Sequence, residues 1–222
     1  MKPEDIKLVS DFHDYYDHNF AYGPYAKTKH QLNRNSNNGM HKYTQLYLMK
    51  TLGFTVPPNG TVESLLDQFP YPELVVYTDP FLHRGEGKEL ISAKHAINKY
   101  PDLFAIPYIE NSNSILGSVT IRILWIGDVG FELQYSSGHY WKGDWRSNYG
   151  DEVHIKLIST MYINRPQANY PLFAIDLIED IVGKRWAIDF NTAPGIKDTP
   201  IQDLYQPRQI AQFIADWYDK VE

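Results

Sequence analysis

The chain of 222 residues contains no cysteine, and this absence excludes several kinds of site. Without cysteine there are no disulfide bonds, no thiolate metal ligands and no cysteine nucleophile. No apolar run approaches the roughly 20 residues that a membrane-spanning helix needs. The first residues, MKPEDIKLVSDFHDYY, lack the apolar core of a signal peptide. We therefore expect a soluble, cytoplasmic protein with no membrane partner.

The chain also lacks a basic excess. Its 21 lysines and arginines are outnumbered by 27 acidic residues, for a formal charge of -6. Because binding to phosphate backbones needs a basic face, this balance argues against a general nucleic-acid binder. With 43% apolar and 22% charged residues, the composition is that of an ordinary globular protein. The length suits one large domain or two small lobes that share a cleft.

The most informative stretch is residues 172–199. Two short apolar segments, LFAIDLI and RWAIDF, are joined by a polar connection that contains Gly183. This pattern predicts a hairpin of two buried strands. Asp176 and Asp189 stand where buried strands usually carry Val or Ile, and a buried carboxylate is costly unless it is paired or bound to a metal.

Asn191 lies two residues after Asp189, so both side chains share one face of the predicted strand. Together with Asp176 they form a group of hard oxygen ligands that suits Mg²⁺. The alternative is that the two aspartates are strand-end residues that cap turns. The residues by themselves leave both interpretations open.

The other segments predict an α+β protein with antiparallel hairpins. The C-terminal helix has its apolar residues at helical spacing, which indicates core packing. The predicted strands cover residues 6–9, 54–56, 73–77, 103–110, 118–126, 130–135, 153–160, 172–178 and 185–190, and the predicted helices cover 10–20, 41–52, 61–68, 92–100 and 207–220.

Three further segments hold candidate functional residues. His13, Asp17 and His18 lie on the first predicted helix, where His13 and Asp17 are one turn apart and could share a metal. A solvated helix face is the favoured alternative. Residues 21–40 form a predicted loop with a local basic excess at Lys27, Lys29, His30 and Arg34. This loop is either an anion-binding lid or, as we favour, simply solvated.

The third segment is the loop after residue 77, where Arg84-Gly85-Glu86-Gly87-Lys88 has glycines that allow close approach of a ligand to the backbone. An ordinary turn is the favoured interpretation. Separately, Arg122 lies in the middle of the apolar strand 118–126. An arginine in this position needs an anion or a carboxylate as its partner.

Four stretches, taken together, resemble the ATP-grasp superfamily, and within it the branch of ribosomal-protein glutamate ligases and related amino-acid ligases. The similarity runs from about Lys42 to the C-terminus, with the motifs in the same order and at similar spacing. The stretches are LYLMKTLGFTVP preceded by His41-Lys42, IRILWIGD, DWRSN, and FAIDLI followed by WAIDFNTAPG.

The resemblance implies an ATP-grasp fold, in which two subdomains with mixed or antiparallel sheets clasp ATP. Residues 1–40 would be a reduced N-terminal segment, 41–110 the small ATP-binding lobe and 111–222 the lobe with the metal site. Lys42 would approach the phosphates, and the backbone of the hinge from Ile106 through Tyr108 to Ile109 would read adenine.

The resemblance also implies the chemistry. Asp176, Asp189 and Asn191 would hold Mg²⁺, with Mn²⁺ as the alternative ion. Arg122, Arg146 and Asn148 would face the γ-phosphate and the carboxylate being activated. A carboxylate would attack the γ-phosphate to give an acyl phosphate, and an amine would then displace phosphate. The partners would be ATP together with small carboxylate and amine substrates, or a peptide or protein terminus.

The sequence departs from the family pattern at three points. Asp189 stands where the family usually has Glu. Tyr77 stands where a second phosphate-binding lysine is expected, and Lys88 or Arg84 would have to replace it. The residues before Lys42 are too few for the usual N-terminal domain. The substituted lysine motivates a second hypothesis, a catalytically silent nucleotide-binding or interaction protein, and His13, Asp17 and His18 motivate a third, a metal-dependent hydrolase.

Overall fold

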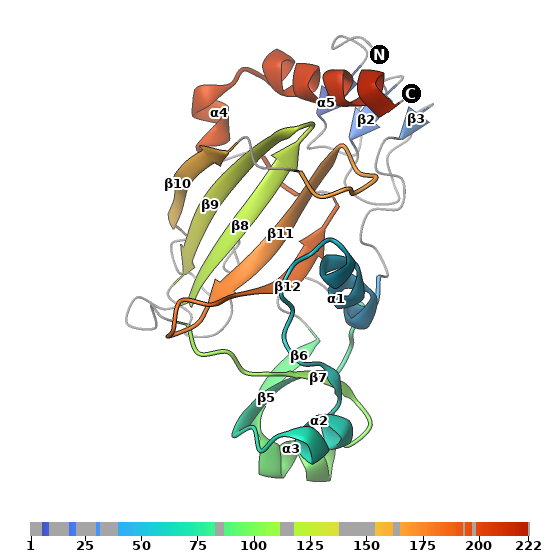
Figure 1. Cartoon of the computed structure of the whole chain (residues 1–222), viewed down its shortest axis with the longest axis vertical. Coiled ribbons are helices and arrows are strands. Elements are labelled where there is room, and N and C mark those ends of the chain that lie inside the picture. The colour runs from blue at the N-terminus through green and yellow to red at the C-terminus, as the bar shows by residue number, and fades with distance from the viewer. Residues whose placement is uncertain are drawn as a thin grey trace.

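The structure is a computed structural model that describes residues 6–8, 18–20, 30–31, 40–82, 87–111, 118–137, 154–161, 165–192, 194–196 and 199–221. It contains a large sheet at one end, a small sheet at the other and helices packed on both (Figure 1). Both of these sheets are antiparallel, and the predicted α+β class is confirmed.

The large sheet has five strands in the order β10-β9-β8-β11-β12. Strands β8 and β9 follow each other in the chain and pair in the sheet, and so do β11 and β12, because a tight turn joins each pair. The strands are β8 Ser118–Ile126, β9 Val129–Ser137, β10 His154–Met161, β11 Leu172–Glu179 and β12 Arg185–Asn191.

Both faces of the large sheet are covered by helices. One face, with Leu124 and Leu133, packs against Ile210 and Ile214 of helix α5 (Pro207–Val221) and against the short helix α4 (Ile201–Leu204). The opposite face, with Trp125 and Phe173, belongs to a second core to which helix α1 (Lys42–Thr51) contributes. A strand buried on both faces is apolar throughout rather than alternating, which explains the sequence of β11.

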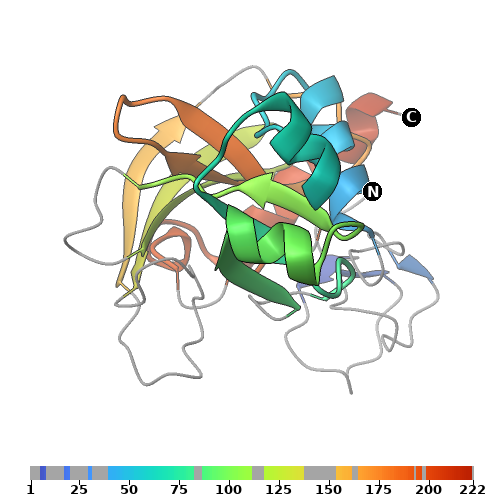
Figure 2. The same ribbon diagram turned by 90° about the horizontal axis from the view of Figure 1, so that it is seen from below.

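The small sheet has the order β4-β7-β5-β6. Leu74 and Val76 of β5 face helices α2 and α3, whereas Val75 and Tyr77 face the core that contains α1. Figure 2 shows the small sheet and its helices in front of the large sheet when the molecule is seen from below. The elements are β4 Gly60–Thr61, α2 Val62–Gln68, β5 Glu73–Tyr77, β6 Lys88–Ser92, α3 Ala93–Lys99 and β7 Phe104–Pro107.

A third, parallel sheet contains β1 (Ile6–Leu8), β2 (His18–Phe20) and β3 (His30–Gln31). Two predictions were therefore wrong. The first predicted helix does not continue through Phe20, and residues 21–40 are not entirely loop, because both segments contribute strands. Such short strands form only where neighbouring segments pair with them, so local sequence patterns do not reveal them.

Most of the other predicted elements are confirmed, including the hairpin of β11 and β12 and the helices α1, α2, α3 and α5. Residues 54–56 are not a strand; they meet β12 through one hydrogen bond, from Ala187 N to Thr55 O at 2.8 Å. Lys88 begins strand β6 rather than ending a loop. None of the helices in the described ranges has both the length and the apolar character needed to cross a bilayer.

The turn between β8 and β9 rests directly on helix α5. Gly127 has φ +58°, and a Cβ added there would lie 1.9 Å from the carbonyl oxygen of Phe213. Gly183, in the turn between β11 and β12, has φ +80° but no atom within 4 Å of such a Cβ. The two glycines thus differ in crowding and not in backbone conformation.

We expect Gly127→Ala to destabilise the protein more than Gly183→Ala. Both variants incur the cost of a left-handed conformation, about 1–2 kcal/mol, and only Gly127→Ala also pushes against α5. Urea unfolding measured side by side tests this difference. Equal losses in the two variants would show that the turn does not need its contact with α5.

Candidate functional site

The hairpin of β11 and β12 places two carboxylates directly opposite each other. Asp176 pairs with Asp189 across the hairpin, and it pairs with Arg122 of β8 on its other side. The register of β12 shifts by one residue next to Asp176, which is the mark of a β-bulge. Like charges directly opposite each other destabilise a sheet, so each aspartate needs a compensating cation.

Arg122 supplies the first cation. Its Nε donates to Asp176 Oδ1 at 2.6 Å, and its Nη2 donates to Oδ2 at 2.8 Å. The two side chains are about one-eighth exposed, so this is a largely buried, bidentate pair. Burial by itself would lower the pKa of Arg122, but the Asp176 carboxylate raises it above its usual value. The guanidinium also lies 4.9 Å from the ring of Tyr135.

Lys42 supplies the second cation, from the first turn of α1. His41 caps this helix, because its Nδ1 accepts from the backbone N–H of Tyr43 at 3.0 Å. The Nζ of Lys42 forms an ion pair with Asp189 and also donates to Gln45 Oε1 at 2.9 Å. Burial would lower the pKa of Lys42, but Asp189 and Tyr77 raise it above its usual value. Lys42 is therefore a buried ammonium ion beside the hairpin.

Gln45 is a site residue that the sequence reasoning missed. It is 1% exposed, and its Nε2 donates to the carbonyl of Met40 at 3.1 Å. Its Oε1 accepts from Lys42 and from the backbone N–H of Phe190 in the edge strand β12, at 3.4 Å. Its position in the sequence could have indicated this role, because a residue three positions after Lys42 lies on the same face of the helix.

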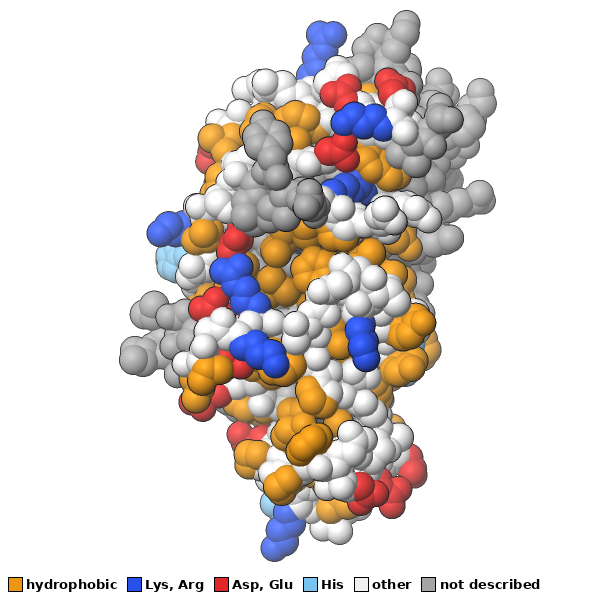
Figure 3. All heavy atoms as spheres, viewed as in Figure 1, with side chains coloured by type: hydrophobic (Ala, Val, Ile, Leu, Met, Phe, Trp, Pro, Cys, Tyr) orange, Lys and Arg blue, Asp and Glu red, His pale blue; other side chains and the backbone are white. Residues whose placement is uncertain are grey.

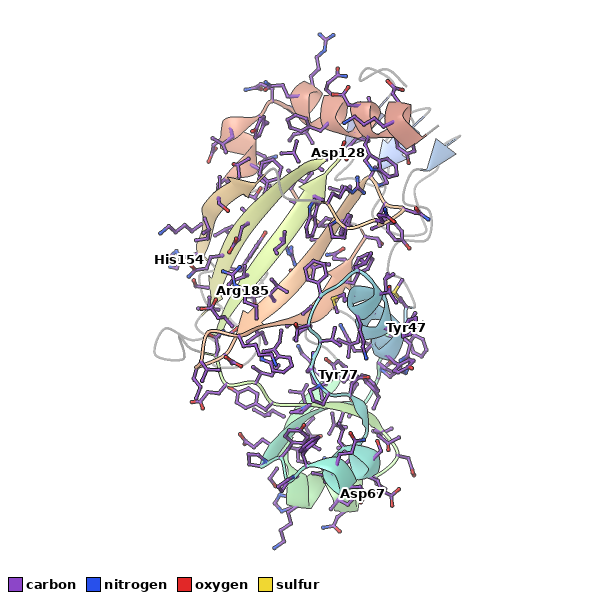
Figure 4. The ribbon with its side chains drawn as sticks, in the orientation of Figure 1. Tyr47, Asp67, Tyr77, Asp128, His154 and Arg185 are labelled. Carbon is purple, nitrogen blue, oxygen red and sulfur yellow. The ribbon has the colours of Figure 1, made fainter. Side chains whose placement is uncertain are left out.

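Tyr77 and Lys88 are direct partners across β5 and β6. Their side chains therefore share the sheet face that looks toward α1, and the Lys42 Nζ lies 5.9 Å from the centre of the Tyr77 ring. Burial raises the pKa of the Tyr77 hydroxyl, so it stays neutral at ordinary pH. Figure 4 shows Tyr77 between the small sheet and α1.

The remaining predicted residues lie in two places. Asn191 pairs with Ala174, one step along the same face as Asp189. Ile106 belongs to β7 opposite Val75, whereas Tyr108 and Ile109 follow the end of that strand. The backbone N–H of Tyr108 donates to the carbonyl of Glu73 at 3.0 Å.

Several predicted residues lie outside the described residues. They include Arg146 and Asn148, the loop residue Arg84, and the His13 and Asp17 of the hydrolase hypothesis. For His18 and His30 the structure describes only the backbone.

The donor set of the hairpin fits Mg²⁺ in kind. Two carboxylates and one carboxamide lie on one face of neighbouring strands. An ionised carboxylate has about four lone-pair sites, so Asp176 can accept both bonds from Arg122 and still offer oxygen to a metal. Mg²⁺ usually takes one or two protein carboxylates and completes its shell with phosphate and water. Among the described residues, no group of three or more His, Cys, Asp or Glu side chains is close enough to hold a metal ion by itself. A metal at this hairpin would therefore need ligands from phosphate and water as well.

No family model matches the sequence. A search among curated proteins finds no match either.

Solved structures, in contrast, show clear similarity to the fold. The ATP-grasp ligase PsnB with a minimal precursor has a TM-score of 0.57 at 12% identity, over 87% of this chain and 65% of PsnB. A Chryseobacterium gregarium RiPP-associated ATP-grasp ligase, with ADP and a leader and core peptide, has a TM-score of 0.51 at 17% identity, over 86% of this chain and 63% of that chain. The macrocyclase MdnC from Microcystis aeruginosa MRC, bound to precursor peptide MdnA, has a TM-score of 0.50 at 16% identity, over 84% of this chain and 65% of MdnC.

These likenesses show that the chain has the ATP-grasp fold, as the sequence motifs predicted. The chain spans less than two thirds of the length of each of these proteins. The branch of ribosomal-protein glutamate ligases stays a prediction.

A double-mutant cycle on Arg122 and Asp176 tests the buried pair. Arg122→Ala or Asp176→Ala leaves an unpaired buried charge, so each should lose about 3–5 kcal/mol of unfolding free energy. The double variant should lose less than the sum, with a coupling of about 1–3 kcal/mol. The exposed pair of Lys99 and Glu89 is a control whose coupling should be much smaller. Additive losses at Arg122 and Asp176 would contradict the pairing.

Proposed function

We propose that the chain is an ATP-dependent ligase that joins a carboxylate to an amine through an acyl-phosphate intermediate. The observation that carries this proposal is the convergence of Lys42, Arg122, Asp176 and Asp189 within an ATP-grasp fold. Solved structures with this fold include the ligase PsnB with Mg and ADP, and PsnB with AMPPNP. Their similarity supports the proposal at the level of the fold.

The buried cations suit phosphoryl transfer, which depends on positioning and on neutralising charge. Lys42 and Arg122 would each exchange part of their contact with a carboxylate for contact with phosphate oxygens. Lys88, opposite Tyr77, is the lysine best placed to replace the one that the family pattern expects at position 77. Arg146 and Asn148 would face the γ-phosphate and the carboxylate being activated.

Asp176, Asp189 and Asn191 would hold Mg²⁺, which when bound supplies positive charge to the triphosphate. The hinge from Ile106 to Ile109 would present its backbone to adenine. Residues 41–110 and 111–222 would be the two lobes that close on the nucleotide, with 1–40 as a reduced N-terminal segment.

The reaction needs no protein nucleophile. An oxygen of the substrate carboxylate attacks the γ-phosphorus and ADP leaves, and the amine nitrogen then attacks the acyl carbon and releases phosphate. Because several of the similar structures hold precursor peptides, we propose a peptide carboxylate or amine as one substrate. The cytoplasm is the proposed compartment.

The second candidate is a nucleotide-binding protein without turnover. Tyr77 in place of a lysine favours it, as does the pairing of both aspartates with protein cations. ADP release that requires both a carboxylate and an amine would support the ligase. Binding of Mg-ATP without ADP release, across a set of acids, amines and peptides, would support the silent protein instead.

Asp189→Ala should abolish Mg-dependent binding of ATP, with a loss of at least about 100-fold in affinity. Titration calorimetry with ATP, with and without Mg²⁺, measures this loss. Asp67→Ala is the matched control, because Asp67 is an exposed carboxylate on α2 at the far end of the small sheet (Figure 4). Unchanged Mg-ATP binding in Asp189→Ala would exclude the proposed metal site.

Lys88→Met should weaken Mg-ATP binding by roughly 10- to 100-fold, because a charged hydrogen bond to phosphate is lost. Lys94→Met, on the exposed surface of α3, removes a lysine of the same small sheet region without facing α1. The same calorimetric titration compares the two variants. Equal affinities would show that Lys88 does not replace the missing lysine.

A further inference from the structure

Helix α1 buries polar residues and exposes aromatic ones. Lys42 and Gln45 are buried, whereas Tyr43 and Tyr47 are more than half exposed. Figure 4 shows Tyr47 on the outer side of α1, and Figure 3 shows large apolar side chains at the surface at the same level of the molecule. An amphipathic helix ordinarily turns these two kinds of residue the other way. Because buried polar groups are costly, hydrogen bonds must compensate Lys42 and Gln45.

The ammonium group of Lys42 has an acceptor for each of its protons. It pairs with Asp189, donates to Gln45 Oε1 at 2.9 Å and donates to the carbonyl of Ile188 at 3.4 Å. An ammonium group has three N–H donors and no acceptor. Lys42 can therefore bind a phosphate oxygen only by giving up one of these three contacts.

The three acceptors differ in their access to solvent. The Asp189 side chain is about one-third exposed, whereas Gln45 is buried and the Ile188 carbonyl belongs to the backbone of β12. A phosphate group can therefore approach on the side of Asp189. Asp189 is the exchangeable partner, and Gln45 and Ile188 are the partners that stay.

The side chain of Gln45 is itself held at both ends. Its Nε2 donates to the carbonyl of Met40, and its Oε1 also accepts from the backbone N–H of Phe190. A carbonyl only accepts, and an ammonium or a backbone N–H only donates, so these partners fix the orientation of the carboxamide. As a neutral acceptor, Gln45 holds the Lys42 ammonium without cancelling its charge.

We propose that Gln45 is a positioning residue, which holds the Lys42 ammonium in place while Lys42 exchanges Asp189 for a phosphate oxygen of the nucleotide. The same exchange leaves Asp189 free to face a metal. The backbone N–H of Lys42 donates to the carbonyl of Pro80 at 3.1 Å, so the start of α1 is also tied to the segment that follows β5. This role rests on the proposed function, because it requires Lys42 to meet phosphate.

Gln45→Met keeps the length of the side chain and removes the acceptor. It should weaken Mg-ATP binding by roughly 10- to 100-fold, because the ammonium is no longer held beside the phosphate. In a Lys42→Met background the same change should alter the affinity by less than about twofold, because Gln45 acts through Lys42. Gln68→Met, on the exposed surface of α2, is the control and should bind like wild type. An equal loss in both backgrounds would show that Gln45 only stabilises the fold, and would overturn the proposal.

A second measurement needs no nucleotide. Formaldehyde and a borane reductant methylate accessible lysines, and mass spectrometry reads each site. Lys42 should react roughly tenfold more slowly than the exposed Lys94, because its ammonium has three acceptors. Gln45→Met should remove most of this protection, and Gln45→Glu, which keeps an acceptor, should restore it.

The two measurements separate the possible failures. Unchanged protection of Lys42 in Gln45→Met would show that Gln45 does not hold the ammonium, and would overturn the proposal whatever the affinity for ATP. Protection that is lost as expected, in a protein whose wild type binds no Mg-ATP, would instead overturn the proposed function and with it the exchange.

Discussion

Two carboxylates that face each other across a hairpin, Asp176 and Asp189, impose the main constraint on this structure. A carboxylate in a largely apolar sheet is costly unless a cation compensates it, and the hairpin itself supplies none to these two. Arg122, on the neighbouring strand, pairs with Asp176, and Lys42, on a helix almost 150 positions earlier in the chain, pairs with Asp189. The arrangement of β8 and α1 around the hairpin therefore satisfies an electrostatic requirement as well as an apolar one.

The edge strand β12 illustrates how the two requirements combine. Its backbone N–H groups donate hydrogen bonds to the carbonyl of Thr55 and to the side chain of Gln45. Its Phe190 and Ala187 side chains belong to the same core as Leu46 and Met49 of α1. Covering an edge in this way prevents pairing with another chain. It also holds the Lys42 ammonium beside Asp189, so the packing of α1 fixes the position of this buried charge.

The large sheet uses its two faces for different chemistry. One face carries the line of Arg122, Asp176 and Asp189 and continues into the core under α5. The other carries apolar residues near α1 and then the ion pairs of Arg185 with Glu132 and Glu179. Side-chain alternation along strands keeps the two sets of charges apart, although Arg122 and Ile121 are adjacent in sequence.

The sequence by itself determined the α+β class, the hairpin, the helices with strong apolar spacing and the need of Arg122 for an acidic partner. Each of these follows from local periodicity, turn residues or the cost of burying a charge. Only the tertiary structure decided that Asp176 is that partner, that Lys88 faces Tyr77, and that Gln45 joins Lys42 to β12. These relations depend on strand register and on contacts between distant segments, and no local pattern records them.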